Sequence, residues 1–177
     1  MPIRIDNFAN IYSKCSDLSP DFGVLLASLL PPSITDPKLL AKLRLSKNSV
    51  NIVCFINSNQ DAFLKMDKNS RKKFLESQLV LNCNAIETFR SKCAEFCKYF
   101  GDRECLEHIN SFKCPKLPIK PGEIIEMLSK AQLKMLRPVI SELTEMWIQS
   151  DYSLDREYLK NEAVRIIESK KSKASAE

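Results

Sequence analysis

The stretch "SVNIVCFIN", residues 49–57, decides the fold class. Its β-branched run is typical of a buried strand, and an apolar run this short does not by itself separate a strand from a buried helix. The chain contains no second strand-like segment to pair with it. A lone strand would leave its backbone N–H and C=O groups unpaired. We therefore expect residues 49–57 to form a buried helix, and the chain to be all-α.

The segments on either side also indicate helices. "LSPDFGVLLASLLPP", residues 18–32, predicts a helix with Ser19 as its N-cap, Pro20 at its first position and Pro31-Pro32 after its end. Asp36-Pro37 predicts the start of the next helix. Residues 84–100 predict a third, because apolar side chains recur there at steps of three and four: Ile86, Phe89, Cys93, Phe96 and Phe100. Gly101 is expected to cap it, and a short helix is expected from Asp102 to Ile109.

The three prolines of "KCPKLPIKPG", residues 113–122, mark the clearest boundary in the chain. We expect a helical body over residues 1–114 and a smaller helical tail over residues 115–177. The tail pattern predicts a short helix from residue 123 to about 128, a longer helix, and a last helix over about 155–167. The core face expected for the longer helix comprises Leu133, Leu136, Ile140, Leu143 and Trp147, with Pro138 as a kink or a second start. The basic end, residues 169–177, is expected to fray.

Composition limits the possible functions. The chain has 177 residues, a net charge of +5, and the apolar and charged content of a soluble globular protein. Its 3 glycines are not grouped, which excludes a glycine-built phosphate loop. No apolar run reaches membrane-spanning length, so no membrane partner is expected. The start, "MPIRIDNFAN", has the pattern of neither a secretory nor a transit peptide, so no targeting peptide is expected.

The cysteines raise the question of a metal site. Seven occur, an odd number, which argues against a disulfide framework. Cys93, Cys97, Cys105 and His108 have the spacing C-x3-C-x7-C-x2-H, which matches none of the usual zinc patterns. The favoured interpretation is that the cysteines pack as small apolar residues, with a regulatory zinc site as the alternative. No nucleophile pair with an orienting third group and no carboxylate pair on a strand is present, so no catalytic residue is predicted.

The densest charge run lies at "KMDKNSRKK", residues 65–73. Its cations are Lys65, Lys68, Arg71, Lys72 and Lys73. The favoured interpretation is a solvated helix start, and the alternative is a surface for an anionic partner.

The ends of the tail carry a family resemblance. "LPIKPGEII" (117–125) followed by "PVISELTEMWIQSDYSLDREYL" (138–159) resembles the C-terminal end of eukaryotic CCA-adding tRNA nucleotidyltransferases. The residues that match this ending are Leu143, Glu145, Trp147, Ser150 and Tyr152. "SPDFGVLLASL" (19–29) and "KLRLSKNSVNIVCFINSNQD" (42–61) resemble the body helices of the same family. The resemblance covers residues 8–167.

The resemblance implies a role in tRNA processing through the body and tail alone. In the family, a carboxylate pair on a separate head holds Mg²⁺, and a neck reads CTP and ATP. Neither part has a counterpart here, so no cofactor is expected in this chain. The implied partners are tRNA, whose elbow the tail reaches, and a separate catalytic head or a full-length homologue. The implied locations are mitochondria, cytoplasm or nucleus. The alternative function is a helical protein–protein interaction module without an RNA role.

The resemblance also suggests which residues bind RNA. Glycines that the family carries before and within the long tail helix are replaced here by Ser129, Leu133 and Arg137. Close approach of backbone to phosphate is therefore not expected. Side chains can make the contact instead, and the candidates are Lys120, Lys130, Lys134 and Arg137, unless they are merely solvated. The candidate packing anchors of the tail are Leu143, Trp147 and Tyr152, a role that we favour over base stacking for the two aromatic rings.

Overall fold

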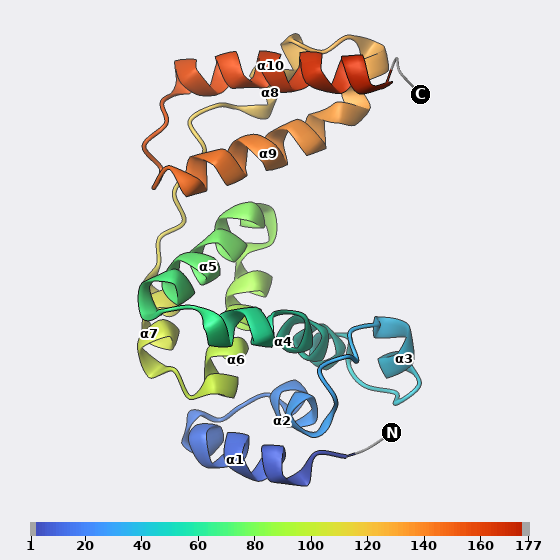
Figure 1. The fold of residues 1–177 in the computed structure, drawn as a ribbon, viewed down its shortest axis with the longest axis vertical. Helices are drawn as coiled ribbons and strands as arrows, with labels where there is room; N and C mark the ends of the chain where they lie inside the picture. Colours follow the sequence, from blue (N-terminus) through green and yellow to red (C-terminus); the bar gives the residue numbers. More distant parts are fainter. Residues whose placement is uncertain (1–2, 175–177) are drawn as a thin grey trace. The chain divides into compact units, whose positions relative to one another are not determined.

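The computed structural model describes residues 3–174. Every regular element in this range is a helix, and no strand occurs in it, which confirms the all-α prediction. The deciding stretch, residues 49–57, lies inside α4 (Lys47–Lys65) (Figure 1). None of the helices within the described range is long and apolar enough to cross a membrane. The chain divides into two compact units, residues 1–113 and 114–177.

The first unit is built from seven α-helices and two short 3₁₀ turns within the described part of the chain. They are α1 (Ile5–Cys15), η1 (Ser16–Leu18), α2 (Phe22–Leu29), α3 (Pro37–Ala41), α4 (Lys47–Lys65), α5 (Lys68–Leu81), η2 (Cys83–Ala85), α6 (Ile86–Phe100) and α7 (Arg103–Ser111). Gly101 closes α6 with a φ of +66°, as its sequence position predicts, because glycine adopts the left-handed region without strain.

Aromatic rings fill the core of the first unit. Phe63 of α4 and Phe96 of α6 are fully buried, with ring centroids 4.8 Å apart in an edge-to-face arrangement. Phe100 packs its ring on both of them, at 4.9 Å and 5.1 Å. Helices α2 and α4 approach each other closely at Gly23, where a Cβ atom would lie 2.9 Å from both the Ile52 side chain and the Ser49 carbonyl oxygen. A side chain at residue 23 would therefore push these two helices apart.

The start of α2 differs from its prediction. Asp21, not Ser19, is the N-cap: its Oδ1 accepts a hydrogen bond of 2.7 Å from the Gly23 backbone N–H. Ser19 adopts a left-handed conformation with φ +48° and lies outside the helix. The Asp21 backbone N–H donates to Glu95 Oε2 of α6 at 2.7 Å. This long-range bond fixes the chain at Asp21 and moves the helix start two residues along.

The second unit consists of α8 (Pro121–Glu126), the 3₁₀ helix η3 (Lys130–Met135), α9 (Leu136–Gln149) and α10 (Arg156–Ala174). Helices α9 and α10 run side by side in opposite directions (Figure 1). The buried apolar side chains of the unit come from all three α-helices, from the segment before α8 and from the turn after it: Ile119, Ile124, Leu128, Val139, Leu143, Trp147, Ile148, Leu159, Ala163, Ile166 and Ile167. Most of the end for which fraying was expected is helical to Ala174, and residues 175–177 lie outside the described residues.

The predicted core stripe of the long tail helix needs one correction. Helix α9 begins at Leu136, so Pro138 lies in its first turn, at a second start rather than at a kink. Leu133 belongs to η3 and is 45% exposed, so it is not a core residue. A 3₁₀ helix turns by about 120° per residue instead of about 100°, which rotates Leu133 away from the α-helical face. Val139, fully buried, lies on the core face of α9 instead.

Candidate nucleic-acid interface

The cations predicted to bind RNA lie in one segment of the second unit, residues 116–137, which we call the basic segment. Lys120 directly precedes α8, Lys130 and Lys134 belong to η3, and Arg137 lies in the first turn of α9. All four side chains are exposed, and so is Lys116, which sequence reasoning did not single out. Within the described part of the chain, none of the five forms an ion pair.

Glu123, one of two acids in the basic segment, is held by cations from α10. Its Oε2 accepts hydrogen bonds from Nε and Nη2 of Arg156 at 2.9 Å and 2.7 Å, and Lys160 Nζ lies 3.6 Å away. Its Oε1 accepts from the backbone N–H of Lys120 at 3.0 Å. The Arg156 guanidinium lowers the pKa of Glu123 below its usual range. The carboxylate is thus already neutralised by α10 and does little to offset the cations around it.

Charge is unevenly distributed along the second unit. Residues 114–137 contain five Lys or Arg and two Glu, whereas residues 138–177 contain six Lys or Arg and eight Asp or Glu. Two cations of α10 are also paired, since Arg165 lies 2.6 Å from Glu162 and Lys170 lies 3.0 Å from Glu142. Among the side chains that the structure describes, positive charge without a carboxylate partner is found in this unit mainly between residues 116 and 137, where an anionic ligand would be attracted.

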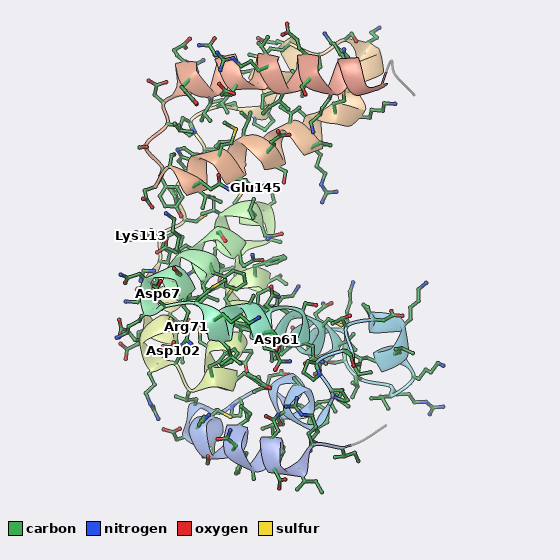
Figure 2. The ribbon with its side chains drawn as sticks, viewed as in Figure 1. Asp61, Asp67, Arg71, Asp102, Lys113 and Glu145 are labelled. Carbon is green, nitrogen blue, oxygen red and sulfur yellow. The ribbon has the colours of Figure 1, made fainter. Side chains whose placement is uncertain are left out.

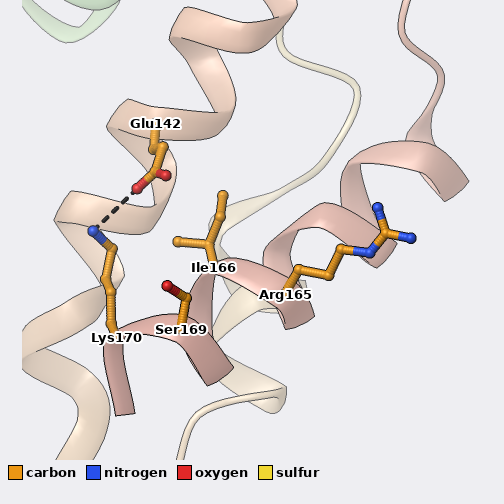
Figure 3. Close-up of a pocket in the computed structure, with 5 residues that line it drawn as sticks. All are labelled: Glu142, Arg165, Ile166, Ser169 and Lys170. Atoms are coloured by element: carbon orange, nitrogen blue, oxygen red, sulfur yellow. Dashed lines mark ion pairs between the residues drawn. The ribbon is translucent and has the colours of Figure 1, made fainter. Parts of the chain in front are cut away.

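A hollow of about 240 Å³ lies between α9 and α10 and is lined by Glu142, Arg165, Ile166, Ser169 and Lys170 (Figure 3). Lys170 points across it to Glu142. Arg165 is paired with Glu162, which is not part of the lining. Both cations of the lining therefore already have a carboxylate partner. This internal pairing makes the hollow a poor anion site compared with the basic segment.

The predicted anchors of the tail lie together at the C-terminal end of α9. Leu143 is fully buried and Trp147 is 3% exposed. The Trp147 and Tyr152 rings meet edge to face with centroids 5.0 Å apart, and the Tyr152 backbone N–H donates to the Trp147 carbonyl oxygen at 2.9 Å. Tyr152 has a φ of +63°, which turns the chain back toward α9. A ring with so little exposed surface has no free face on which a base could stack.

The 65–73 charge run holds two helices of the first unit together. Lys68 and Lys72 of α5 both pair with Glu104 of α7, the latter at 2.5 Å. Arg71 points toward Asp102 at the start of α7, with 3.8 Å between the charged atoms (Figure 2). Arg71 also donates from Nε to the Phe63 carbonyl oxygen at 3.2 Å. Most of the positive charge in this run is therefore engaged by carboxylates of its own unit.

The cysteine and histidine set is not arranged around a common point. Cys93, Cys97 and Cys105 are fully buried, and burial raises the pKa of the Cys93 and Cys105 thiols to about 12. His108 Nε2 lies 2.6 Å from Glu76 Oε1 of α5 instead. No group of three or more potential ligands suited to a metal ion occurs among residues 3–174. Thiolate ligands would also have to form against this burial.

The molecule thus belongs to the class of all-helical chains with an unpaired basic surface segment, and no protein-family model matches it. Over 156 residues it is 24% identical to CCA tRNA nucleotidyltransferase 1, mitochondrial, of Mus musculus. The enzymes with the same name from Homo sapiens and Danio rerio are 23% and 21% identical over 155 and 156 residues. Each match covers 88% of this chain but only 35–36% of the relative. The chain is distantly similar to these enzymes and spans about a third of their length.

Proposed function

We propose that this chain binds tRNA through the basic segment and serves as the body and tail of a CCA tRNA nucleotidyltransferase, supporting the addition and repair of the 3′-terminal CCA. The observation that carries the proposal is that Lys120, Lys130, Lys134 and Arg137 form no ion pair among the described residues, next to a half of the unit that has a net negative charge. The distant similarity to enzymes whose names specify tRNA supports the choice of ligand.

Phosphate contact is the form of binding that suits these side chains. A-form RNA offers its backbone and 2′-hydroxyl groups to a protein surface, and its deep major groove is closed to side chains. Lys and Arg on flexible stems bind phosphate as charges without requiring the close backbone approach that glycines allow. Binding of this kind reads the shape of the RNA, and each contact releases a counterion. We therefore expect weak, salt-dependent affinity without sequence preference.

Nucleotidyl transfer itself is proposed to come from a catalytic head that lies outside these residues. The chain spans about a third of the relatives, and no catalytic carboxylate pair was predicted in its sequence. The head would supply Mg²⁺ binding and the selection of CTP and ATP. A mitochondrial location is proposed from the names of the relatives.

The test compares two triple variants that lose the same charge. Lys130, Lys134 and Arg137 are replaced by alanine in the first, and Arg165, Lys170 and Lys171 of α10 in the second. Fluorescence anisotropy with labelled tRNA is measured over a series of salt concentrations. We expect the first variant to bind more weakly, with a salt slope flatter by about two to three units, because up to three phosphate contacts are lost. The second variant should keep the parent's affinity and slope.

Two results would contradict the proposal. Equal losses in the two variants would show that only net charge matters and that the basic segment is no site. If the parent chain fails to bind tRNA even at low salt, an RNA role for this chain is wrong, and a helical protein-docking module becomes the better interpretation.

A further inference from the structure

A second basic surface lies in the first unit, on a projection formed by α3 and the turn after it. We call residues 36–48 the α3 projection. Of the ten residues 35–44, only Leu40 is buried. Leu40, at 2% exposure, is the anchor that attaches α3 to the rest of the unit, where α3 packs on α4 (Figure 1). Arg44 takes a left-handed conformation with φ +52°, which turns the chain back toward α4.

The α3 projection has an excess of positive charge. Its cations are Lys38, Lys42, Arg44 and Lys47, all exposed, and none forms an ion pair among the residues that the structure describes. Its one acid, Asp36, caps α3 by accepting a 2.8 Å hydrogen bond at Oδ1 from the Lys38 backbone N–H. The 65–73 run, which is equally basic in sequence, is instead tied down by Glu104 and Asp102.

Two leucines stand exposed among these cations. Leu39 is 49% exposed and Leu43 is 53% exposed. Leu39 belongs to α3 and Leu43 lies in the turn after it, so the sequence from Lys38 to Arg44 places both leucines among three cations. Keeping apolar surface in water costs free energy, and covering Leu39 and Leu43 with an apolar environment would recover that cost.

We propose that the α3 projection contacts the surface of an anionic lipid bilayer, with Leu39 and Leu43 entering the headgroup boundary and the four cations lying against acidic lipid headgroups. Segments that bind membrane surfaces pair Lys or Arg, which attract anionic lipids, with apolar residues that enter the headgroup boundary. Phosphate-backbone contact with RNA would use the cations but gains nothing from the leucines. A protein partner is less favoured, because binding hot spots are enriched in Trp, Tyr and Arg, whereas leucine is under-represented in them.

This contact differs from a membrane span. The expectation that the chain has no membrane partner rested on the lack of a long apolar run, and that feature does not bear on a surface contact. Each Lys or Arg near an anionic bilayer increases the binding constant about fivefold, and the two leucines increase it further. Contributions of this size give reversible binding. Because much of the attraction is electrostatic, the binding should weaken as the salt concentration rises.

Vesicle co-sedimentation of the full chain tests the proposal. The parent should pellet with vesicles of phosphatidylcholine and phosphatidylserine, and not with phosphatidylcholine alone. Lys38→Gln with Lys42→Gln should weaken pelleting by about 25-fold, from two contributions of about fivefold each. Leu39→Ser with Leu43→Ser should weaken it without a change in charge. Circular dichroism should be unchanged in each, because all four side chains are exposed.

The matched control is Lys130→Gln with Lys134→Gln in the second unit, which removes the same charge from the basic segment. This control should keep vesicle binding and lose tRNA binding, while the α3 variants do the opposite. The proposal is overturned if the parent does not pellet with anionic vesicles, if the control weakens pelleting as much as the α3 lysine variant, or if the leucine variant pellets like the parent. An α3 lysine variant that loses only tRNA binding would assign the projection to RNA instead.

Discussion

Trp147 offers the sharpest test of how the second unit is stabilised. Three contributions to its stability depend on this side chain: burial of the ring, its contact with Tyr152, and a buried N–H donor. The indole is 3% exposed, and replacing such a ring by alanine costs about 3–5 kcal/mol. Its edge-to-face contact with Tyr152 contributes about 0.5–1.5 kcal/mol more. Against this, Nε1 is buried without a hydrogen-bond partner among the described residues, which destabilises the folded state by about 1–3 kcal/mol. Replacing Trp147 removes this cost. Trp147→Ala should therefore destabilise the unit by about 2–4 kcal/mol.

Trp147→Phe separates these effects. Phenylalanine keeps an aromatic ring against Tyr152 and removes the unpaired N–H donor, so the lost indole volume and the relieved donor nearly offset each other. We expect Trp147→Phe to stay within about 1 kcal/mol of the parent. The measurement is amide hydrogen exchange followed by mass spectrometry on the full chain, because two units can open independently and a single melting curve would merge them.

Peptides from α9 and α10 should exchange about 30- to 700-fold faster in Trp147→Ala, since 1.4 kcal/mol corresponds to a factor of ten. Peptides from α4 and α6 belong to the other unit and serve as the internal control. If Trp147→Ala leaves exchange unchanged but weakens tRNA binding, the ring stacks on a base and its packing role is wrong. If Trp147→Phe is as damaging as Trp147→Ala, the indole N–H has an acceptor that matters.

Three further predictions concern packing, acid stability and catalysis. Gly23→Ala should destabilise by about 1–3 kcal/mol, because its Cβ would meet Ile52 at 2.9 Å, whereas Gly122→Ala, with nothing within 4 Å, should be neutral or stabilise by up to about 1 kcal/mol in thermal unfolding. Lys68 and Lys72 lower the pKa of Glu104 to about 2 from its ordinary 4.5. Because the folded pKa is the lower one, this contribution to stability is complete above pH 4.5 and is lost as pH falls toward 2, so Glu104→Gln should flatten that part of the curve of melting temperature against pH. The purified chain should incorporate no labelled CMP or AMP into tRNA, and incorporation above background in a preparation free of host enzyme would contradict the prediction that the sequence carries no catalytic residue.

The fold class was predictable because it depended on one argument about backbone pairing. Residues 49–57 read locally as a strand, and the lack of any partner strand made the helix the only solution that pairs their N–H and C=O groups. Helix α6 was predictable from its apolar steps and from Gly101, since both signals are local. Element type follows from such local rules when the pattern is long and has a clear end.

The predicted helix boundaries were wrong where a residue distant in sequence, or a change from α-helix to 3₁₀ helix, determines the boundary. Ser19 and Asp21 both satisfy the N-cap rule, and the choice between them depends on Glu95, which lies 74 positions from Asp21. Leu133 fits a core stripe only if the helix is α-helical throughout, and the 3₁₀ segment η3 breaks that assumption. Neither the contact with Glu95 nor the 3₁₀ conformation of η3 can be recognised from the neighbouring sequence.

The sequence indicates which residues of the candidate site are cations. It does not indicate which of these cations lack a carboxylate partner in the folded chain. By sequence, residues 65–73 and residues 130–137 are both basic stretches at a helix start. Structure separates them through carboxylates that are remote in the chain: Glu104 lies 32 positions from Lys72, and Glu123 lies 33 positions from Arg156. Pairing of this kind needs the tertiary fold, so no count of lysines along the chain could have ranked the two clusters.

The idea that ion pairs with carboxylates keep the lysines of residues 65–73 from binding RNA can be tested directly. In Glu104→Gln, Lys68 and Lys72 lose their common carboxylate, and two cations on α5 become free beside Lys65 and Lys73. We expect tRNA affinity at low salt to rise, and the salt slope to steepen by about one to two units, one for each released lysine that reaches a phosphate.

Glu107→Gln is the matched control, because it removes the same charge from an exposed position on the same helix, α7, where the carboxylate holds no cation among the described residues. A gain of equal size in both variants would mean that net charge, not the release of paired lysines, sets the affinity. If Glu104→Gln binds tRNA like the parent, pairing does not explain why the 65–73 run differs from the basic segment, and the ranking of the two surfaces loses its physical basis.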